Sequence, residues 1–352
     1  MNSTIRKMTK QILPKLRMLG VPEQVNIPIK ICFERGIFNK YGIDVDYSTI
    51  KEGTGAMLKK IDEGEADIAI TVTDGFIAGQ AAGYNVSLIG TYVDSPLTWA
   101  VCGAPDSSLN SIQDFIAKSQ KKIGISRLKS GSHTMSYYMN YIHNINKDEI
   151  NEENFKVLGG FDNLLAGVQS HEVDLFLWEV FTTKPWFDSG ALKYLGEVKT
   201  PWSAFSIISH PNFANNETSA TLFRERFVPA LQEGVEIFLE SSNQQFNEEN
   251  RQIKQIDHQQ PKQLTAAERI VQDFGHTHED ASTWLAATKY SNLMEVDLTL
   301  TENTVQILRQ VGLVPQNYTV DRVWGGSNNK AIRFSPIQQN TNQSTTIVKE
   351  TC

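Results

Sequence analysis

Cysteine is scarce in this chain. The three cysteines, Cys32, Cys102 and Cys352, are an odd number and have no paired spacing. A disulfide framework needs an even set, and a structural zinc site needs ligands in close pairs, so the sequence predicts neither. Cysteines of this kind suit a reducing compartment.

Excess positive charge and long apolar runs are also missing. The chain has 33 Lys and Arg against 40 Asp and Glu, a net charge of -7, and no basic domain to neutralise phosphates, so nucleic acid is not an expected partner. Lys10, Lys15 and Arg17 interrupt the apolar residues near the N-terminus. If the chain starts at its natural residue, we expect no export, no membrane partner and a cytoplasmic location.

Common catalytic motifs are absent as well. The sequence contains no Gly-rich phosphate loop, no Gly-x-Ser-x-Gly elbow and no HExxH pair. His276, His278, Glu279 and Asp280 are close in sequence, but Thr277 has the features of a helix N-cap and the two acids those of a first helical turn. We therefore predict no metal site and no bound cofactor.

What is present is the composition of a globular protein of about two domains: 352 residues, 40% hydrophobic and 21% charged. The first third alternates β-rich runs with segments whose apolar residues recur every three or four positions. This alternation predicts a parallel sheet covered by helices. The predicted strands are 16–21, 43–50, 66–72 and 86–93, and the predicted helices are 28–38, 55–64 and 74–83.

A second α/β unit follows a strand at 97–102 and a turn at 103–106, which we interpret as a domain crossing. Its strands are predicted at 122–126, 155–158, 173–178 and 192–198, and a strand at 204–209 returns to the first unit. The pattern is then almost wholly helical from 221 to 312, with starts at Ser219, Asn247, Thr265, Thr277 and Thr301. The prediction is a two-lobed α/β fold: residues 1–102 and 201–325 form the first lobe, 103–200 the second, and 326–352 a polar extension.

The opening of the chain resembles a known family. Val21-Pro22-Glu23, Gly36-Ile37-Phe38, Gly42-Ile43-Asp44-Val45 and the later Gly64, Asp67 and Ile68 match its pattern. The family comprises solute-binding proteins for taurine, alkanesulfonates and thiamine-precursor pyrimidines, together with the fungal thiamine-pyrimidine synthases. The resemblance covers roughly residues 16–320 and implies a type II periplasmic-binding-protein-like fold, a venus flytrap of two lobes.

The same resemblance bears on catalysis. The synthases carry a cofactor-binding lysine and a substrate histidine after the third strand, where this chain has Thr71 and Gly75. They also carry a cysteine cluster where this chain has Pro201-Trp202-Ser203-Ala204-Phe205-Ser206. The resemblance therefore implies the fold without the synthase residues.

Ligands of two-lobed α/β proteins bind at the carboxyl ends of the strands, between the lobes. This rule selects loops from both lobes as the candidate site. The residues selected are Glu23, Thr73, Asp74, Ser95, Thr98 and Trp99 from the first lobe, Arg127, Ser130, Gly131, Ser132, His133, Trp178 and Glu179 from the second, and Phe205 at the second crossing.

The most distinctive of these loops is Ser130-Gly131-Ser132, which follows a strand and opens a helix. Backbone N–H groups and hydroxyls at a helix N-terminus favour a negative group, and Arg127 would add a bidentate contact. This predicts a cradle for a small anion. The alternative is a plain N-cap at Ser130 or Ser132.

The other candidates have structural alternatives too. Ser95 to Trp99 form either a wall of the pocket or a tight turn beside a core tryptophan. Glu23 would accept a hydrogen bond from an amine or be a solvated loop carboxylate, and Asp74 is predicted to cap the helix that follows it. Glu179 ends an apolar strand, which favours a role in the cleft because an acid is rarely buried alone.

The sequence thus predicts a protein that binds a small polar or anionic metabolite between two lobes, as an intracellular solute-binding sensor or carrier. The alternative is an enzyme of thiamine-pyrimidine precursor biosynthesis on the same fold.

Overall fold

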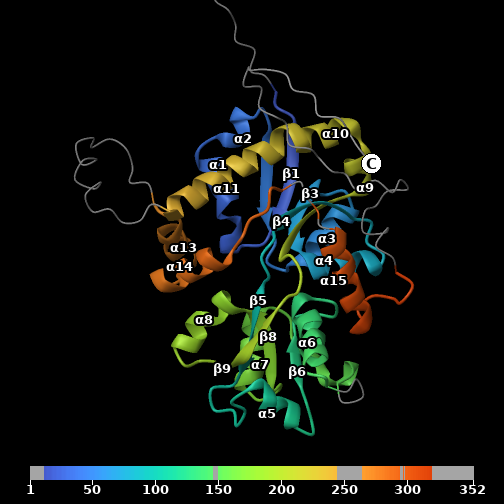
Figure 1. Ribbon diagram of the computed structural model, residues 1–352, viewed down its shortest axis with the longest axis vertical. Helices are drawn as coiled ribbons and strands as arrows, with labels where there is room; N and C mark the ends of the chain where they lie inside the picture. The colour runs from blue at the N-terminus through green and yellow to red at the C-terminus, as the bar shows by residue number, and fades with distance from the viewer. Residues whose placement is uncertain (1–11, 146–149, 244–263, 294–295, 297, 319–352) are drawn as a thin grey trace, which may run out of the picture.

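Two five-stranded sheets, one in each lobe, organise the computed structural model of this chain (Figure 1). The structure describes residues 12–145, 150–243, 264–293, 296 and 298–318. Across these ranges, no helix is both long and apolar enough to cross a membrane.

The first sheet has the order β2-β1-β3-β10-β4. Its strands are β1 (Lys15–Gly20), β2 (Asp44–Thr49), β3 (Ile68–Val72), β4 (Ser87–Val93) and β10 (Phe205–Ser209). β1 pairs with β2 and β3 in parallel, as the alternating pattern predicts. The sheet is not wholly parallel, however, because β10 returns from the second lobe and pairs antiparallel with both β3 and β4.

The second sheet has the order β7-β6-β8-β5-β9 and mirrors this plan. Its strands are β5 (Thr98–Gly103), β6 (Ile123–Ile125), β7 (Phe155–Val157), β8 (Leu175–Glu179) and β9 (Lys193–Lys199). β5 pairs antiparallel with β8 and β9. Residues 98–102 therefore pair in the second sheet, although the sequence assigned them to the first lobe. The turn at 103–106 only ends β5, and the chain passes between the sheets at residues 94–97.

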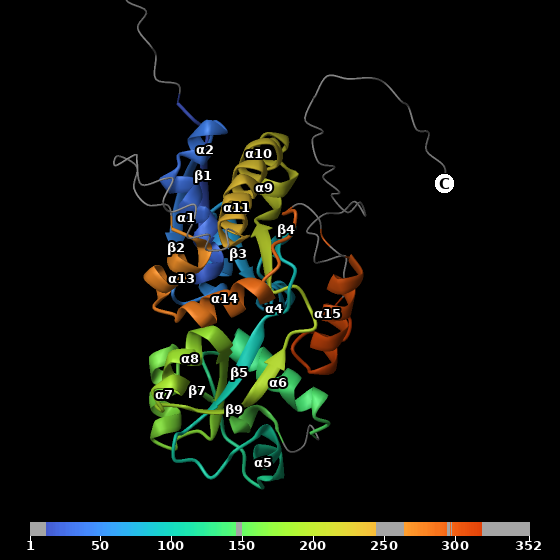
Figure 2. The same ribbon diagram turned by 60° about the vertical axis from the view of Figure 1, so that its left-hand side comes forward.

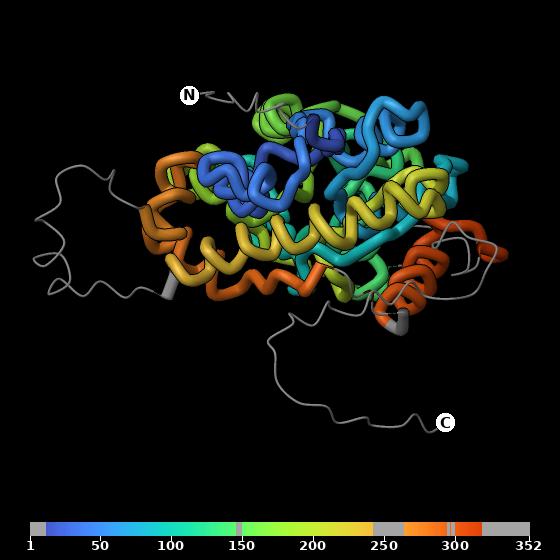
Figure 3. The backbone as a smooth tube through the Cα atoms, turned by 90° about the horizontal axis from the view of Figure 1, so that it is seen from above, coloured from blue at the N-terminus to red at the C-terminus, as the bar shows by residue number. Residues whose placement is uncertain are grey.

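Helices from both ends of the chain surround the first sheet (Figures 1 and 3). The early ones are α1 (Ile27–Glu34), α2 (Ile37–Lys40), α3 (Thr54–Asp62) and α4 (Thr73–Ala81), and the later ones are α9 (Pro211–Asn215), α10 (Glu217–Leu222), α11 (Val228–Asn243), α13 (Ala266–Phe274), α14 (His278–Ala287) and α15 (Leu298–Gln310). The long α11 packs along α1, and α15 contacts α4.

The predicted helix starts can be compared with these bounds. Thr265 and Thr277 are confirmed as N-caps, because their hydroxyls accept the backbone N–H groups of Glu268 and Asp280. α10 and α15 begin earlier than predicted, at Glu217 and Leu298. The predicted start at Asn247 and the polar extension 326–352 lie outside the described residues.

The second lobe has α7 (Phe161–Gln169) and α8 (Val180–Asp188) on one side of its sheet and α6 (Gly131–Ile142) on the other (Figure 2). α5 (Ile112–Ala117) lies at the end of this lobe far from the first (Figure 1). α8 was not predicted from the sequence, because Pro185 lies inside it and proline usually argues against a helix interior.

Two adjacent segments connect the lobes. The backbone N–H of Thr200 donates to the carbonyl of Leu97 at 3.0 Å, and that of Ala204 donates to the carbonyl of Ser95 at 3.1 Å. The Leu97 N–H in turn donates to the Thr200 hydroxyl at 2.9 Å. Residues 94–97 and 200–204 therefore form one hydrogen-bonded hinge beside the crevice between the sheets.

Candidate functional site

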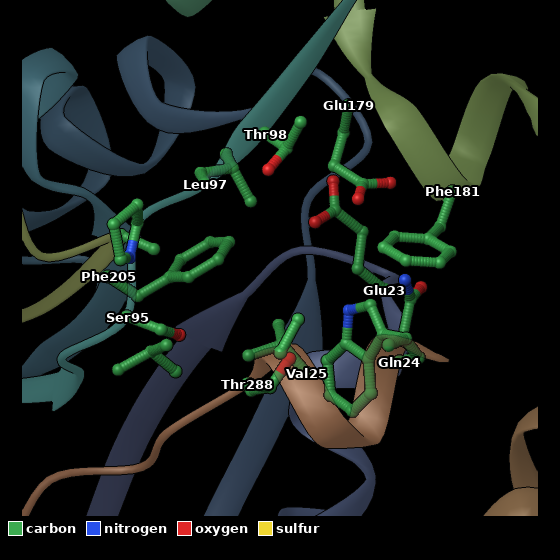
Figure 4. A pocket seen from close by; sticks show the side chains of 15 residues that line it. Glu23, Gln24, Val25, Ser95, Leu97, Thr98, Glu179, Phe181, Phe205 and Thr288 are labelled. Atoms are coloured by element: carbon green, nitrogen blue, oxygen red, sulfur yellow. The ribbon is translucent and has the colours of Figure 1, made fainter. Parts of the chain in front are cut away.

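A cavity opens between the lobes beside this hinge (Figure 4). Its enclosed space is ≈ 40 Å³, and the volume including the opening to solvent is ≈ 470 Å³. Loops after β1 and β8, both connecting segments and α14 supply its walls. The residues that define its chemistry are Glu23, Gln24, Ser95, Thr98, Glu179, Phe181, Phe205, Trp284 and Thr288.

Glu23 brings a carboxylate into the cavity from the first lobe. Within the described part of the chain, its side chain has no hydrogen bond and no ion pair, and its carboxylate faces that of Glu179 (Figure 4). Burial, with a smaller contribution from the charge of Glu179, raises the pKa of Glu23 to about 8. Glu23 is therefore largely protonated at neutral pH.

Glu179 brings a second carboxylate from the opposite lobe. It ends β8 and caps α8, because its Oε2 accepts the Thr182 N–H at 2.7 Å and the Thr182 hydroxyl at 2.8 Å. Burial raises the pKa of Glu179, and these two donors partly offset that effect. Only 7% of the residue is exposed, so its position is fixed by the start of α8.

The remaining wall is largely apolar. Phe181, Phe205 and Trp284 face the cavity together with the hydroxyls of Thr98 and Thr288. Gln24 lies in the loop after the first strand that the strand-end rule selects, whereas Phe181, Trp284 and Thr288 were not among the predicted site residues. Phe181 lies two residues after the predicted Glu179, but nothing in the sequence signals that α14 reaches the cleft.

Two predicted hydroxyls are already engaged by the fold. The Thr73 hydroxyl bonds that of Ser206 at 2.8 Å, and the Ser95 hydroxyl accepts the Lys289 N–H at 3.0 Å. Thr73 thus ties α4 to β10, and Ser95 ties the hinge to the segment after α14.

Asp74 lies deeper in the interface between the lobes. It occupies the first turn of α4, whose N-cap is Val72, so Asp74 is not the predicted cap. Burial raises its pKa to about 6, while its own N–H, the Thr134 hydroxyl, the Trp202 indole N–H and the Gly75 N–H favour the charged form. Asp74 Oδ2, Thr134 Oγ1 and Trp202 Nε1 are buried close to one another, although none has a partner within hydrogen-bonding distance. Polar atoms from both lobes therefore meet here.

Arg127 lines a second opening between the lobes, beside Gly55, Tyr84 and Gly131. Its Nη1 donates to the backbone carbonyl of Glu52 in the first lobe at 2.5 Å. Burial lowers the pKa of Arg127, and no carboxylate pairs with it in the described part of the chain. The guanidinium thus contacts both lobes and retains donors for a further acceptor.

The hydroxyls of the neighbouring loop, residues 130–132, are already hydrogen-bonded within the loop. Ser130 caps α6 by accepting the His133 N–H, while the Ser132 hydroxyl accepts the Ser126 N–H at 3.0 Å and bonds the Ser130 hydroxyl at 2.9 Å. These hydroxyls stabilise the loop itself. A Cβ on Gly131 would lie 2.6 Å from the Trp99 ring, so this glycine is needed for the close approach of that ring.

Two other predicted residues pack inside the second lobe instead of lining the cavity. The His133 ring lies 4.9 Å from that of Tyr137 and 4.7 Å from that of Phe155, and burial lowers its pKa to about 4. Trp178 packs on Phe161, with ring centroids 5.5 Å apart. Trp99 is buried, and its indole N–H has no partner.

Ser132→Ala is expected to destabilise the fold by about 1–2 kcal/mol, because the partly buried Ser126 N–H and the buried Ser130 hydroxyl both lose a partner. Chemical denaturation of the variant measures this change. Ser282→Ala, which removes an exposed helical hydroxyl, is the control and should change stability by about 0.5 kcal/mol or less. An unchanged stability in Ser132→Ala together with weaker binding of an anion would favour the predicted cradle.

Comparison with known proteins places this geometry in a wider context. The sequence profile of the Ca3427-like PBP family, a group of periplasmic binding proteins, matches residues 99–198, which run from β5 to β9. Among solved structures, the Candida albicans CA3427 gene product, described as having the generic periplasmic binding protein fold, is similar with a TM-score of 0.72 and 24% identity over 88% of this chain and 95% of that one. The chain has a type II periplasmic-binding-protein fold. The predicted resemblance and fold class are thereby confirmed.

Other proteins with the periplasmic-binding-protein fold are more distant in sequence. The alkanesulfonate-binding protein SsuA of Xanthomonas axonopodis pv. citri, bound to MOPS, has a TM-score of 0.64 and 13% identity over 89% of this chain and 99% of its own. The nitrate-binding protein NrtA of Synechocystis PCC 6803 has a TM-score of 0.59 and 12% identity over 88% of this chain and 85% of its own. No curated protein sequence matches this chain significantly.

Proposed function

We propose that this protein binds a small polar metabolite between its lobes and works as a solute-binding sensor or carrier. One observation carries the proposal: Glu23 and Glu179 approach from opposite lobes in one cavity, and Glu23 has no protein partner in the described residues. A half-buried carboxylate without a partner is costly to ionise, and a ligand with donor groups reduces that cost.

Ligand binding would be coupled to closure. Groups from both lobes meet only when the crevice is closed, so a ligand that contacts both lobes favours the closed form by its differential affinity. The hydrogen-bonded hinge at residues 94–97 and 200–204 lies at the edge of the crevice, where it can absorb this motion.

An anionic group on the ligand is best placed at the second opening. Arg127 has donors to spare there, whereas the first cavity presents two carboxyl groups and, in the described residues, no cation. Proteins of this fold are named as binding alkanesulfonate and nitrate, which are anions. We further propose that the protein acts inside the cell. Cys32 and Cys102 are free and buried, a form that a reducing compartment preserves.

The resemblance to thiamine-pyrimidine synthases suggests an enzyme as the second candidate. The described residues do not fit the required cofactor chemistry. Thr71 is a fully buried hydroxyl and cannot form the imine that a lysine forms with pyridoxal phosphate. A Cβ on Gly75 would lie 3.0 Å from the Thr54 and Val72 side chains, so the site also has little room for an imidazole. Binding without chemistry is therefore the better supported function.

Native mass spectrometry of freshly purified protein tests the proposal. We expect a bound small molecule that is released on denaturation and raises the melting temperature when added back. Thr98→Trp, which fills the cavity, should abolish both effects, while the exposed Thr49→Trp should not. The proposal fails if Thr98→Trp retains the molecule, or if cell metabolite fractions produce no binding and no compaction in small-angle X-ray scattering.

A further inference from the structure

We propose that the cavity between Glu23 and Glu179 recognises an organic ammonium group joined to an apolar body. The inference rests on the proposed function and names the ligand chemistry at this end of the cleft. It follows from three features of the cavity: two facing carboxyl groups without a protein cation in the described residues, an unpaired amide and an aromatic wall.

In the described part of the chain, no cation pairs with the two carboxyl groups. Glu23 has no ion pair in the described residues. Glu179 accepts hydrogen bonds from the N–H and hydroxyl of Thr182 and from the Phe181 N–H, and none of these donors is a cation. The nearby lysines have other partners: Lys184 pairs with Asp188 and Asp280, and Lys289 pairs with Asp94. A cation supplied by the ligand would allow both carboxylates to be charged in a closed cleft.

Gln24 provides an independent indication of a ligand. The residue is only 4% exposed and lines the same cavity, yet its side-chain amide has no hydrogen bond in the described part of the chain. Figure 4 shows this side chain beside Glu23. A protonated primary amine has three donors and no acceptor. Glu23, Glu179 and the Gln24 carbonyl together supply the three acceptors that such a group needs.

The aromatic wall favours an organic cation over a metal ion. Phe181, Phe205 and Trp284 cover the apolar side of the cavity, and ring faces attract ammonium groups while they bury attached carbon. Calcium takes six to eight oxygen ligands. The described residues contain no group of three or more His, Cys, Asp or Glu side chains that could hold a metal.

The proposal implies that binding releases a proton. Without a bound cation Glu23 is largely protonated below about pH 8, whereas an ammonium ligand needs it ionised. The other titratable groups that act on Glu23 are Glu179 and Tyr47, and a negative charge on either one disfavours ionised Glu23. The affinity for an ammonium ligand should therefore rise with pH between about 6 and 8, by at most about tenfold per pH unit, and level off above that range.

The test compares three probes with the same apolar body: benzylammonium, benzyl alcohol and benzoate. Isothermal titration of the full chain at pH 8 should show saturable binding of benzylammonium, with at least about tenfold weaker binding of the other two.

Glu23→Gln should weaken the binding of benzylammonium at least about tenfold and remove the pH dependence of its affinity. Glu240→Gln, an exposed glutamate on α11, is the charge-matched control and should leave both unchanged. Because Glu179 also caps α8, Gln24→Leu is the better second variant, and it should weaken benzylammonium without altering the fold measured by circular dichroism.

The outcomes separate this inference from the proposed function. Equal or tighter binding of benzoate, or benzylammonium binding that Glu23→Gln leaves unchanged, overturns the ammonium assignment. So does the absence of benzylammonium binding up to about 10 mM, beyond the weak end of useful affinities. If the native molecule found by mass spectrometry has no amine, the solute-binding function stands and only this inference fails. If no molecule and no closure are found, the proposed function fails first.

Discussion

Replacing Glu23 with glutamine is expected to stabilise the ligand-free protein at pH 8 by about 1–3 kcal/mol, a range that allows for the partial solvent contact of this carboxylate. The reason is the raised pKa of about 8 in the closed state. Between the ordinary value of 4.5 and about 8, the unfolded chain ionises Glu23 while the folded chain keeps it protonated. The unfolded state then binds fewer protons, so wild-type stability falls as pH rises through this window.

Other groups titrate nearby, so the informative quantity is the difference between variant and wild type. The pKa of Asp74, raised to about 6, also lowers the stability of the folded protein as pH rises. The pKa of His133, lowered to about 4, has the opposite effect and lowers that stability as pH falls. Urea denaturation from pH 5 to pH 9 should show a gain for Glu23→Gln that is small at pH 5 and largest near pH 8. A gain that is constant across this range would mean that Glu23 is ionised throughout.

Gly90→Ala is expected to destabilise the first lobe by about 1–3 kcal/mol and to loosen the outer wall of the cavity. Gly90 lies in β4, and a Cβ there would overlap the Leu293 carbonyl oxygen. The segment after α14 is held to β4 by the N–H of Ser291, which donates to the Tyr92 carbonyl at 3.0 Å, and by the bridge between Val93 and Tyr290. Displacing this segment would move Thr288 and the end of α14 away from the cavity.

Gly160→Ala is the matched control, because nothing lies within 4 Å of a Cβ at that position and its φ is -68°. It should lower the free energy of unfolding by no more than about 1 kcal/mol, because Gly160 is the N-cap of α7 and alanine is a poorer cap than glycine. Thermal unfolding measures the stability, and hydrogen exchange of residues 284–293 reports the wall. Normal protection of residues 284–293 in Gly90→Ala would show that β4 shifts instead of this segment. The wall would then not depend on the close approach of Gly90 and Leu293.

Much of the fold was predictable because its signals are local. The ten strands lie close to their predicted positions, since apolar runs bounded by turn residues form strands in almost any α/β context. The motif glycines Gly36 and Gly42 have φ of 64° and 71°. This backbone conformation favours glycine, so the motif can be recognised from the sequence alone. The threonine caps of α13 and α14 were recognised for the same reason, because a cap and its partner are three residues apart.

Strand pairing was not local and was partly mispredicted. Nothing near residues 98–103 shows that β5 pairs with β8 and β9, because its partners lie about 70 to 100 residues later in the chain. A strand's own composition does not specify which sheet accepts it. The same applies to β10, whose place between β3 and β4 depends on the return of the chain from the second lobe.

The sequence by itself determined two α/β units, their strand ends as the region of the site, and the absence of synthase residues at Thr71 and Gly75. The tertiary structure alone decided which of those strand-end residues face a ligand. It engaged Ser130, Ser132 and Thr73 in bonds within the fold, and it brought Glu23 and Glu179 together from opposite lobes. The physical reason is that a side chain's charge and hydrogen-bonding capacity are encoded locally, whereas its unsatisfied capacity depends on the residues that the fold places around it.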